Sequence, residues 1–224
     1  MITLNKNTII LTVASVLIIF GFLYLVFSTS NKPTSNEPFQ SAKTLSENDH
    51  IKWASESGNL LVEYSDFQCP NCKLWSDFFN QLGQTNDPNF EKIKENVTFV
   101  YRHFPLTNIH PNALESAHAA EAAAMQDKFY EMHDLLFLNQ ASWSELKDPT
   151  DYFVGLAEDL EIDIEKFKSD LTSSEVKSKV NQDLDSGRRA NVNSTASFYL
   201  NGQYLSNLNS TQDLLDILLE EIEK

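Results

Sequence analysis

The hydrophobic pattern separates an apolar leader from a longer region of mixed elements. Residues 8–27 form a run of 20 residues without a charge. At about 1.5 Å of rise per residue, a helix of this length spans roughly the 30 Å hydrocarbon core of a bilayer. We therefore expect a transmembrane anchor at 8–27, preceded by a short segment at 1–7. The alternative is a cleaved signal peptide, which predicts a shorter apolar run and a small-residue cleavage site, and Ser28 and Ser30 offer a poor one.

A polar stretch at 28–48 follows the apolar run. It is rich in Ser, Asn, Thr, Lys, Pro and Glu, and it contains Pro33 and Pro38. This composition is typical of a flexible linker. We therefore expect a folded domain at 49–222 that is tethered close to the membrane surface.

The first part of this domain has the order strand, helix, strand. Residues 60–64 are mainly apolar and predict a buried strand. Residues 73–82 repeat apolar side chains at spacings of three and four, which predicts one face of a helix. Residues 97–101 are rich in β-branched and aromatic side chains and predict a second strand. Because a helix separates the two strands, we expect them to be parallel.

Helical patterns then continue over about 112–188, and strand-like residues return only at 197–200 and 203–205. Asn201-Gly202, between the last two runs, is a strong signal for a hairpin turn. A last helix is expected at 211–222, where the preceding Ser210 and Asp213 have the spacing of a capping box. The predicted fold class is therefore α/β, with βαβ, a helical insertion and ββα in that order.

The composition favours a folded, acidic protein. Hydrophobic residues make up 42% of the 224 residues, and 15 Phe are more than a disordered chain would contain. The 32 acidic residues against 17 basic ones give a formal charge of −15. Because binding to phosphate groups needs clustered Lys and Arg, we expect no nucleic-acid partner.

The chain has only two cysteines, Cys69 and Cys72, in a Cys-Pro-Asn-Cys motif between the first predicted strand and its helix. A helix N-terminus presents unpaired N–H groups and a partial positive charge, which lower the pKa of a cysteine placed there. We therefore expect Cys69 to be the nucleophile and Cys72 to resolve a mixed disulfide. Pro70 suits the first helical turn, where its missing N–H leaves no hydrogen bond unmade.

Three other interpretations of the cysteine pair are weaker. A structural disulfide closing so short a loop would stabilise the fold by only about 2 kcal/mol. A zinc site needs four ligands, so His103, His110 or His118 would have to supplement the two thiolates. Two inert buried thiols would not require a position at a strand-to-helix junction. We expect neither a metal nor another cofactor.

Glu63 lies six residues before Cys69, inside the first predicted strand. If its carboxyl group is buried beneath the cysteines, its pKa should rise and it could exchange protons with Cys72. The strand is apolar on both sides, so an exposed carboxylate remains the alternative. His103, at the end of the second strand, and His133, in the helical stretch, are expected to be structural.

Four segments together form a specific pattern: 63–72 (EYSDFQCPNC), 101–106 (YRHFPL), 128–137 (KFYEMHDLLF) and 194–202 (STASFYLNG). In this order they resemble the DsbA-like proteins of the thioredoxin superfamily, in particular the membrane-anchored bacterial forms. The resemblance covers about 49–222. It implies a thioredoxin fold with a helical domain inserted between the second and third strands. It also implies a protein thiol-disulfide oxidoreductase in which Cys69 attacks, Cys72 resolves and Glu63 is the buried acid.

The sequence departs from this family at one position. The family has a cis-proline after a Thr in the loop facing the cysteines, whereas Thr195 is followed here by Ala196. A cis bond before a non-proline residue costs about 2.5–4 kcal/mol, so we expect a trans bond and a displaced loop. The resemblance implies that this loop, with Pro70 and Asn71, borders the bound substrate.

The function that we expect is disulfide formation in exported proteins. Disulfides persist outside the cytosol, and Cys-Pro-X-Cys resembles the oxidising members of the family. The domain should face the extracytoplasmic side of the cell membrane, act on exported protein thiols, and be reoxidised by a membrane redox partner. The alternatives are a reductase or isomerase with the same site, and a peptide-binding module without turnover, which Ala196 would favour.

Overall fold

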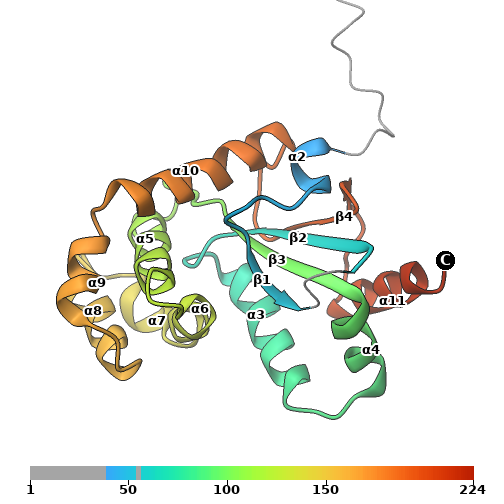
Figure 1. Cartoon of the computed structure of the whole chain (residues 1–224), viewed down its shortest axis with the longest axis horizontal. Helices are drawn as coiled ribbons and strands as arrows, with labels where there is room; N and C mark the ends of the chain where they lie inside the picture. Colours follow the sequence, from blue (N-terminus) through green and yellow to red (C-terminus); the bar gives the residue numbers. More distant parts are fainter. Residues whose placement is uncertain (1–38, 54–56) are drawn as a thin grey trace, which may run out of the picture. The chain divides into compact units, whose positions relative to one another are not determined.

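The computed structural model describes residues 39–53 and 57–224 of the chain (Figure 1). The expected anchor at 8–27 lies outside the described residues. Within the two described ranges, every helix is too short or too polar to cross a bilayer.

A mixed sheet with the strand order β1-β3-β2-β4-β5 forms the centre of the domain. Its strands are β1 (His50–Trp53), β2 (Asn59–Ser65), β3 (Val97–His103), β4 (Ser197–Leu200) and β5 (Gln203–Tyr204). The strands β2 and β3 are parallel, which confirms the prediction, and the other neighbouring pairs are antiparallel. This is the thioredoxin-like α/β fold that the sequence predicts. The edge strand β1 was not expected.

Helices cover both faces of the sheet, as Figure 1 shows. One face, which carries Leu61 and Phe99, packs against α3 (Pro70–Gly83), α4 (Pro88–Asn96) and α11 (Thr211–Ile222). The opposite face, which carries Val62 and Tyr64, packs against α2 (Gln40–Lys43) and α10 (Ser174–Arg189). The two central strands are therefore buried along almost their whole length.

A group of helices lies between β3 and β4 in the chain. They are α5 (Ala113–Ala124), α6 (Phe129–Leu138), α7 (Gln140–Trp143), α8 (Thr150–Asp159), α9 (Ile164–Asp170) and α10. They share a core with Met132, Trp143 and Phe153 at its centre. Phe67 and Cys72 belong to the same core, so this insertion packs directly against the cysteine segment.

Residues 39–48, the last part of the stretch expected to be a linker, are folded on the sheet. The main-chain N–H of Phe39 donates to the carbonyl of Gly202 at 2.8 Å. The guanidinium of Arg102 donates to the carbonyls of Ser41 and Thr44 and forms two hydrogen bonds, of 2.9 and 2.7 Å, with the Asp49 carboxylate. A buried guanidinium needs several acceptors, and this segment supplies two of them, which is why it is not a free tether.

Two local predictions near the C-terminus are confirmed. Asn201 and Gly202 form the turn between β4 and β5, with φ values of 52° and 82°. The capping box of α11 is present, since the N–H of Asp213 donates to Ser210 Oγ at 3.2 Å and the N–H of Ser210 donates to the Asp213 carboxylate at 3.0 Å.

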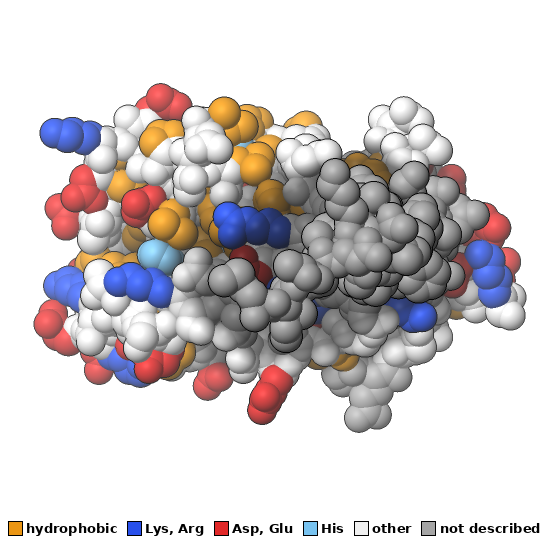
Figure 2. Space-filling model, turned by 90° about the horizontal axis from the view of Figure 1, so that it is seen from above, with side chains coloured by type: hydrophobic (Ala, Val, Ile, Leu, Met, Phe, Trp, Pro, Cys, Tyr) orange, Lys and Arg blue, Asp and Glu red, His pale blue; other side chains and the backbone are white. Residues whose placement is uncertain are grey.

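Figure 2 shows how charge is distributed on the face seen from above. Among the described residues, Asp and Glu side chains are scattered around its outline, with Lys and Arg side chains between them. On the visible part of this face, the acidic surplus is therefore not concentrated in one patch.

Candidate active site

Cys69 lies at the N-terminus of α3, where the sequence placed it. It is the N-cap residue, and Pro70 is the first residue of the helix. The main-chain N–H of Cys69 donates to the carbonyl of Asp66 at 3.0 Å, and the carbonyl of Cys69 accepts the N–H of Lys73 at 3.2 Å. The Cys69 side chain is therefore close to main-chain N–H groups that have no acceptor within the helix.

The helical insertion fixes the loop before α3. The side-chain amide of Gln140 donates to the carbonyls of Phe67 and Cys69 at 2.7 and 3.1 Å. The side chain of Gln68 accepts the main-chain N–H of Asn112 at 2.7 Å. The cysteine loop is thus held by helices that follow it by more than 40 positions in the chain.

Asp66 organises the same loop, although the sequence analysis did not single it out. Its carboxylate is buried and accepts the main-chain N–H groups of Gln68 and Leu106 at 2.8 and 2.9 Å. It also lies 2.7 Å from Nδ1 of His110. The sequence could have indicated this role, because an Asp side chain often accepts the main-chain N–H two residues further along the chain, as in an Asx-turn.

The two thiols have opposite electrostatic environments. The pKa of Cys69 is lowered to about 5, first by a hydrogen bond from the Cys72 side chain and then by the Thr195 side chain and the N–H groups of Cys72 and Asn71; partial burial opposes this shift. Cys72 is fully buried, and burial raises its pKa well above the ordinary value. At neutral pH the pair therefore consists of a Cys69 thiolate and a Cys72 thiol.

Glu63 is buried, so the alternative of an exposed carboxylate on this strand is excluded. It lies on β2, opposite Tyr101 on β3 and Phe198 on β4, and it is 4% exposed. Burial raises its pKa to about 7, while the Ser65 side chain and Lys52 act in the opposite direction. The carboxyl group can therefore gain and lose a proton near neutral pH.

The peptide bond between Thr195 and Ala196 is cis, so the expectation of a trans bond and a displaced loop was wrong. Contacts on both sides hold the loop in place. The free-energy cost of a cis bond in an isolated peptide does not include such contacts. The carbonyl of Thr195 accepts a hydrogen bond from Cys69 Sγ at 3.4 Å. On the other side, Ser197 Oγ donates to the carbonyl of Ser194 at 2.8 Å, and β4 begins at Ser197.

A groove of about 270 Å³ begins beside the cysteines. Asn71 and Ala196 are among its lining residues, so it includes positions that flank Cys69 on two sides. Its lining also includes Leu74 and Tyr204, whose side chains are 64% and 47% exposed. A groove with both polar and accessible apolar side chains thus lies beside the thiolate.

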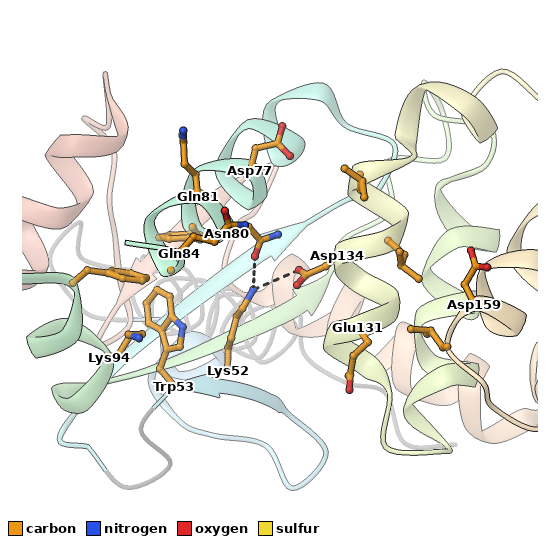
Figure 3. A pocket seen from close by; sticks show the side chains of 16 residues that line it. Lys52, Trp53, Asp77, Asn80, Gln81, Gln84, Lys94, Glu131, Asp134 and Asp159 are labelled. Atoms are coloured by element: carbon orange, nitrogen blue, oxygen red, sulfur yellow. Dashed lines mark hydrogen bonds and ion pairs between the residues drawn. The ribbon is translucent and has the colours of Figure 1, made fainter. Parts of the chain in front are cut away.

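A larger groove of about 920 Å³ is lined by residues of β1, α3, α4 and α6 (Figure 3). In it the ammonium group of Lys52 lies 3.4 Å from the Asn80 side-chain oxygen and 3.6 Å from the Asp134 carboxylate. Its lining includes none of residues 68–73, whereas Asn71 and Ala196 line the smaller groove. The smaller groove is therefore the one that lies nearer the thiols.

Two of the histidines considered as zinc ligands, His103 and His110, have carboxylate partners. Nε2 of His103 lies 2.7 Å from the Glu121 carboxylate, which also contacts His50. In the part of the chain that the structure describes, the one cluster of three possible metal ligands is His103, Glu121 and Asp183, and it includes neither cysteine. His133 is buried among aromatic rings, in agreement with a structural role.

The thioredoxin-like fold and the asymmetric cysteine pair at a helix N-terminus define the class of thiol-disulfide oxidoreductases. A family model described as thioredoxin matches residues 46–220. The chain therefore belongs to this thioredoxin family.

Solved structures show the DsbA-like fold that the sequence motifs indicated. A thioredoxin-like oxidoreductase from Silicibacter pomeroyi has a TM-score of 0.65 and 20% identity, with 83% of this chain and 98% of that chain covered. The alpha-DsbA1 protein from Wolbachia pipientis has a TM-score of 0.64 and 17% identity, with 84% and 98% covered. At these identities the likeness concerns the fold.

A curated relative, Na(+)/H(+) antiporter NhaA 1 from Salinispora arenicola, is 36% identical over 157 residues, which are 69% of this chain and 22% of the relative. The chain thus spans about a fifth of the length of these curated relatives.

Proposed function

We propose that the protein is a thiol-disulfide oxidase that introduces disulfide bonds into exported proteins. The observation that carries this proposal is the lowered pKa of Cys69 beside a buried Cys72 thiol. Stabilising the Cys69 thiolate stabilises the reduced form of the pair. A disulfide whose reduced form is stabilised is a strong oxidant, the reason given for the DsbA prototype.

In the proposed reaction, a substrate thiolate attacks Cys69 Sγ of the Cys69–Cys72 disulfide. The bond between the two sulfurs breaks, its electron pair passes to Cys72 Sγ, and Cys72 takes up a proton. A second substrate thiolate then attacks the substrate sulfur of the mixed disulfide and releases Cys69 as a thiolate. The substrate loses two electrons, and the protein gains them as one thiolate and one thiol.

The groove beside Asn71 and Ala196 supports extended, partly apolar peptides as substrates. Leu74 and Tyr204 offer apolar contact area to such a peptide, and the nearby Thr195 carbonyl can accept a hydrogen bond. The apolar run at 8–27 supports a membrane anchor with the domain on the extracytoplasmic side. A membrane redox partner would then reoxidise the dithiol.

The reduction potential of the pair tests the direction of exchange. We would equilibrate the full chain in glutathione buffers and quantify the thiols by alkylation. An oxidase should have a potential near about −120 mV, as the DsbA prototype has, whereas a value near about −270 mV, as in thioredoxin, would indicate a reductase. A Cys72→Ser variant should also accumulate mixed disulfides with exported proteins, because the resolving thiol is missing.

A further inference from the structure

Three polar side chains lie on the sheet face beneath Cys72. Glu63 and Ser65 are two residues apart on β2, so their side chains point to the same face. Tyr101 is the partner of Glu63 on the parallel strand β3 and shares this face. The helix α3, which carries Cys72, covers the face.

The end of β2, where Ser65 lies, is close to the Cys72 sulfur. The N–H of Asp66, the residue that follows Ser65, points at Cys72 Sγ over 3.5 Å. The Ser65 side chain also lowers the pKa of Glu63, of Cys72 and of Tyr101.

The hydroxyl groups of Ser65 and Tyr101 are buried and unpaired. Ser65 is 1% exposed and Tyr101 is 0% exposed. Among residues 39–53 and 57–224, no atom is in hydrogen-bonding geometry with Ser65 Oγ or with the Tyr101 hydroxyl. Buried polar groups without a partner are uncommon in folded proteins and call for a functional explanation. A hydroxyl group can donate one proton while it accepts another, which is the property that a proton relay requires.

We propose that the Ser65 hydroxyl relays the proton between Glu63 and Cys72 during thiol-disulfide exchange; this rests on the proposed function. When the disulfide is attacked, the leaving Cys72 sulfur takes the Ser65 hydroxyl proton, and Ser65 takes the proton of the Glu63 carboxylic acid. The products are a Cys72 thiol, a neutral Ser65 and a Glu63 carboxylate. The reverse transfers deprotonate Cys72 when it attacks a mixed disulfide.

The test compares Ser65→Ala with Ser76→Ala in the full chain. Ser76 is a matched control, because it is also a buried serine without a hydrogen-bond partner among the described residues, and it lies on α3. Reduction of the oxidised protein by dithiothreitol is followed by stopped-flow fluorescence. At neutral pH, Ser65→Ala should slow this step about tenfold, which is less than the loss of a general acid or base itself would cause. Ser65→Thr, which keeps the hydroxyl group, should restore most of the rate, and Ser76→Ala should leave it unchanged.

A double-variant comparison shows whether Ser65 acts through Glu63. Glu63→Gln should slow the step, and adding Ser65→Ala should slow it no further, because the two residues act in one transfer. A wild-type rate in Ser65→Ala, or the same additional tenfold loss in the Glu63→Gln background, would overturn the relay.

A solvent isotope effect on the wild-type protein tests the relay without any variant, so the test stands even if a variant fails to fold. The rate of reduction is measured in mixtures of H₂O and D₂O. If two protons move in the same step, a plot of this rate against the D₂O fraction should be curved, whereas a straight line would reject the relay. The reduction potential, measured on the same samples, reports separately on the proposed function. A thioredoxin-like potential with a tenfold effect of Ser65→Ala would reject the oxidase and keep the relay.

Discussion

Cys69 Sγ lies 3.4 Å from the main-chain carbonyl oxygen of Thr195, to which it donates a hydrogen bond when the thiol is protonated. This contact joins the N-terminus of α3 to the loop before β4, which is 126 positions away in the chain. It places the reactive sulfur between a helix end and a main-chain acceptor. A peptide that reaches Cys69 therefore meets the reactive sulfur and the Thr195 carbonyl together.

Cys72 should control the ionisation of Cys69, because its hydrogen bond is the largest cause of the lowered Cys69 pKa. In the reduced wild-type protein, Cys69 should titrate with a pKa of about 5. Cys72→Ala removes the donor and should raise this value by at least one unit. Cys72→Ser keeps a donor and should raise it less. The ultraviolet absorbance of the thiolate as a function of pH gives the three values, and equal values in the two variants would contradict the assignment.

Glu63 should make folding stability depend on pH. Its pKa is about 7 in the folded protein, against an ordinary value of 4.5, so the folded state retains a proton that the unfolded state loses between these pH values. The stabilisation is fully present below pH 4.5 and is lost as the pH rises through about 7, by about 3 kcal/mol.

The measurement is urea unfolding of the reduced protein at several pH values, compared with Glu63→Gln. Cys69 has a lowered pKa and contributes in the opposite sense, with stability that falls as the pH drops through about 5. This contribution is common to both proteins and cancels in their difference. A difference that stays constant between pH 4.5 and 8 would show that Glu63 is not buried as described.

The buried pair of Arg102 and Asp49 should be important for stability. Both side chains are almost inaccessible, at 2% and 1% exposure. Asp49→Asn leaves a buried guanidinium without its counter-charge and should cost about 3–5 kcal/mol in chemical denaturation. Asp185→Asn, which removes an exposed partner of Arg188, should change the free energy of unfolding by less than about 1 kcal/mol. Equal effects would mean that the buried pair contributes no more than a surface contact.

Gly187 allows α10 to pack closely against the sheet. A Cβ at this position would lie 2.5 Å from the Phe104 ring and 3.1 Å from the Tyr64 ring. Gly187→Ala should therefore cost about 1–3 kcal/mol, although alanine favours a helix. Gly155→Ala, in α8, meets no atom within 4 Å and should stabilise the protein by up to about 1 kcal/mol. Thermal unfolding of the two variants should therefore shift in opposite directions.

The order of the elements was predictable because the main strands and helices have distinct periods. The edge strand β1 was not, because it has only four residues and alternation is hard to recognise over so short a stretch. The helix α4 was also not predicted, although Asp87 caps it by accepting the N–H groups of Asn89 and Phe90.

Within the site, the cysteine positions followed from local sequence, but the direction of Glu63 did not. Both faces of β2 are buried, so its residues do not alternate between polar and apolar. The hydrogen bonds from Gln140 were beyond sequence reasoning, because they depend on how the insertion packs 71 positions further along the chain. The same limit applies to the loop at Thr195, whose conformation depends on its contact with Cys69.

Cys72 is fully buried in a core that it shares with Phe67, with Tyr101 of the sheet and with the helical insertion. A disulfide and a pair of thiols differ in shape, so they pack differently against the same helices. The redox state of the pair and the local opening of the insertion are therefore thermodynamically linked. Amide hydrogen exchange in these helices should be slower in the redox state, disulfide or dithiol, that packs better against them. By favouring that state, the helices also help to set the reduction potential of the pair.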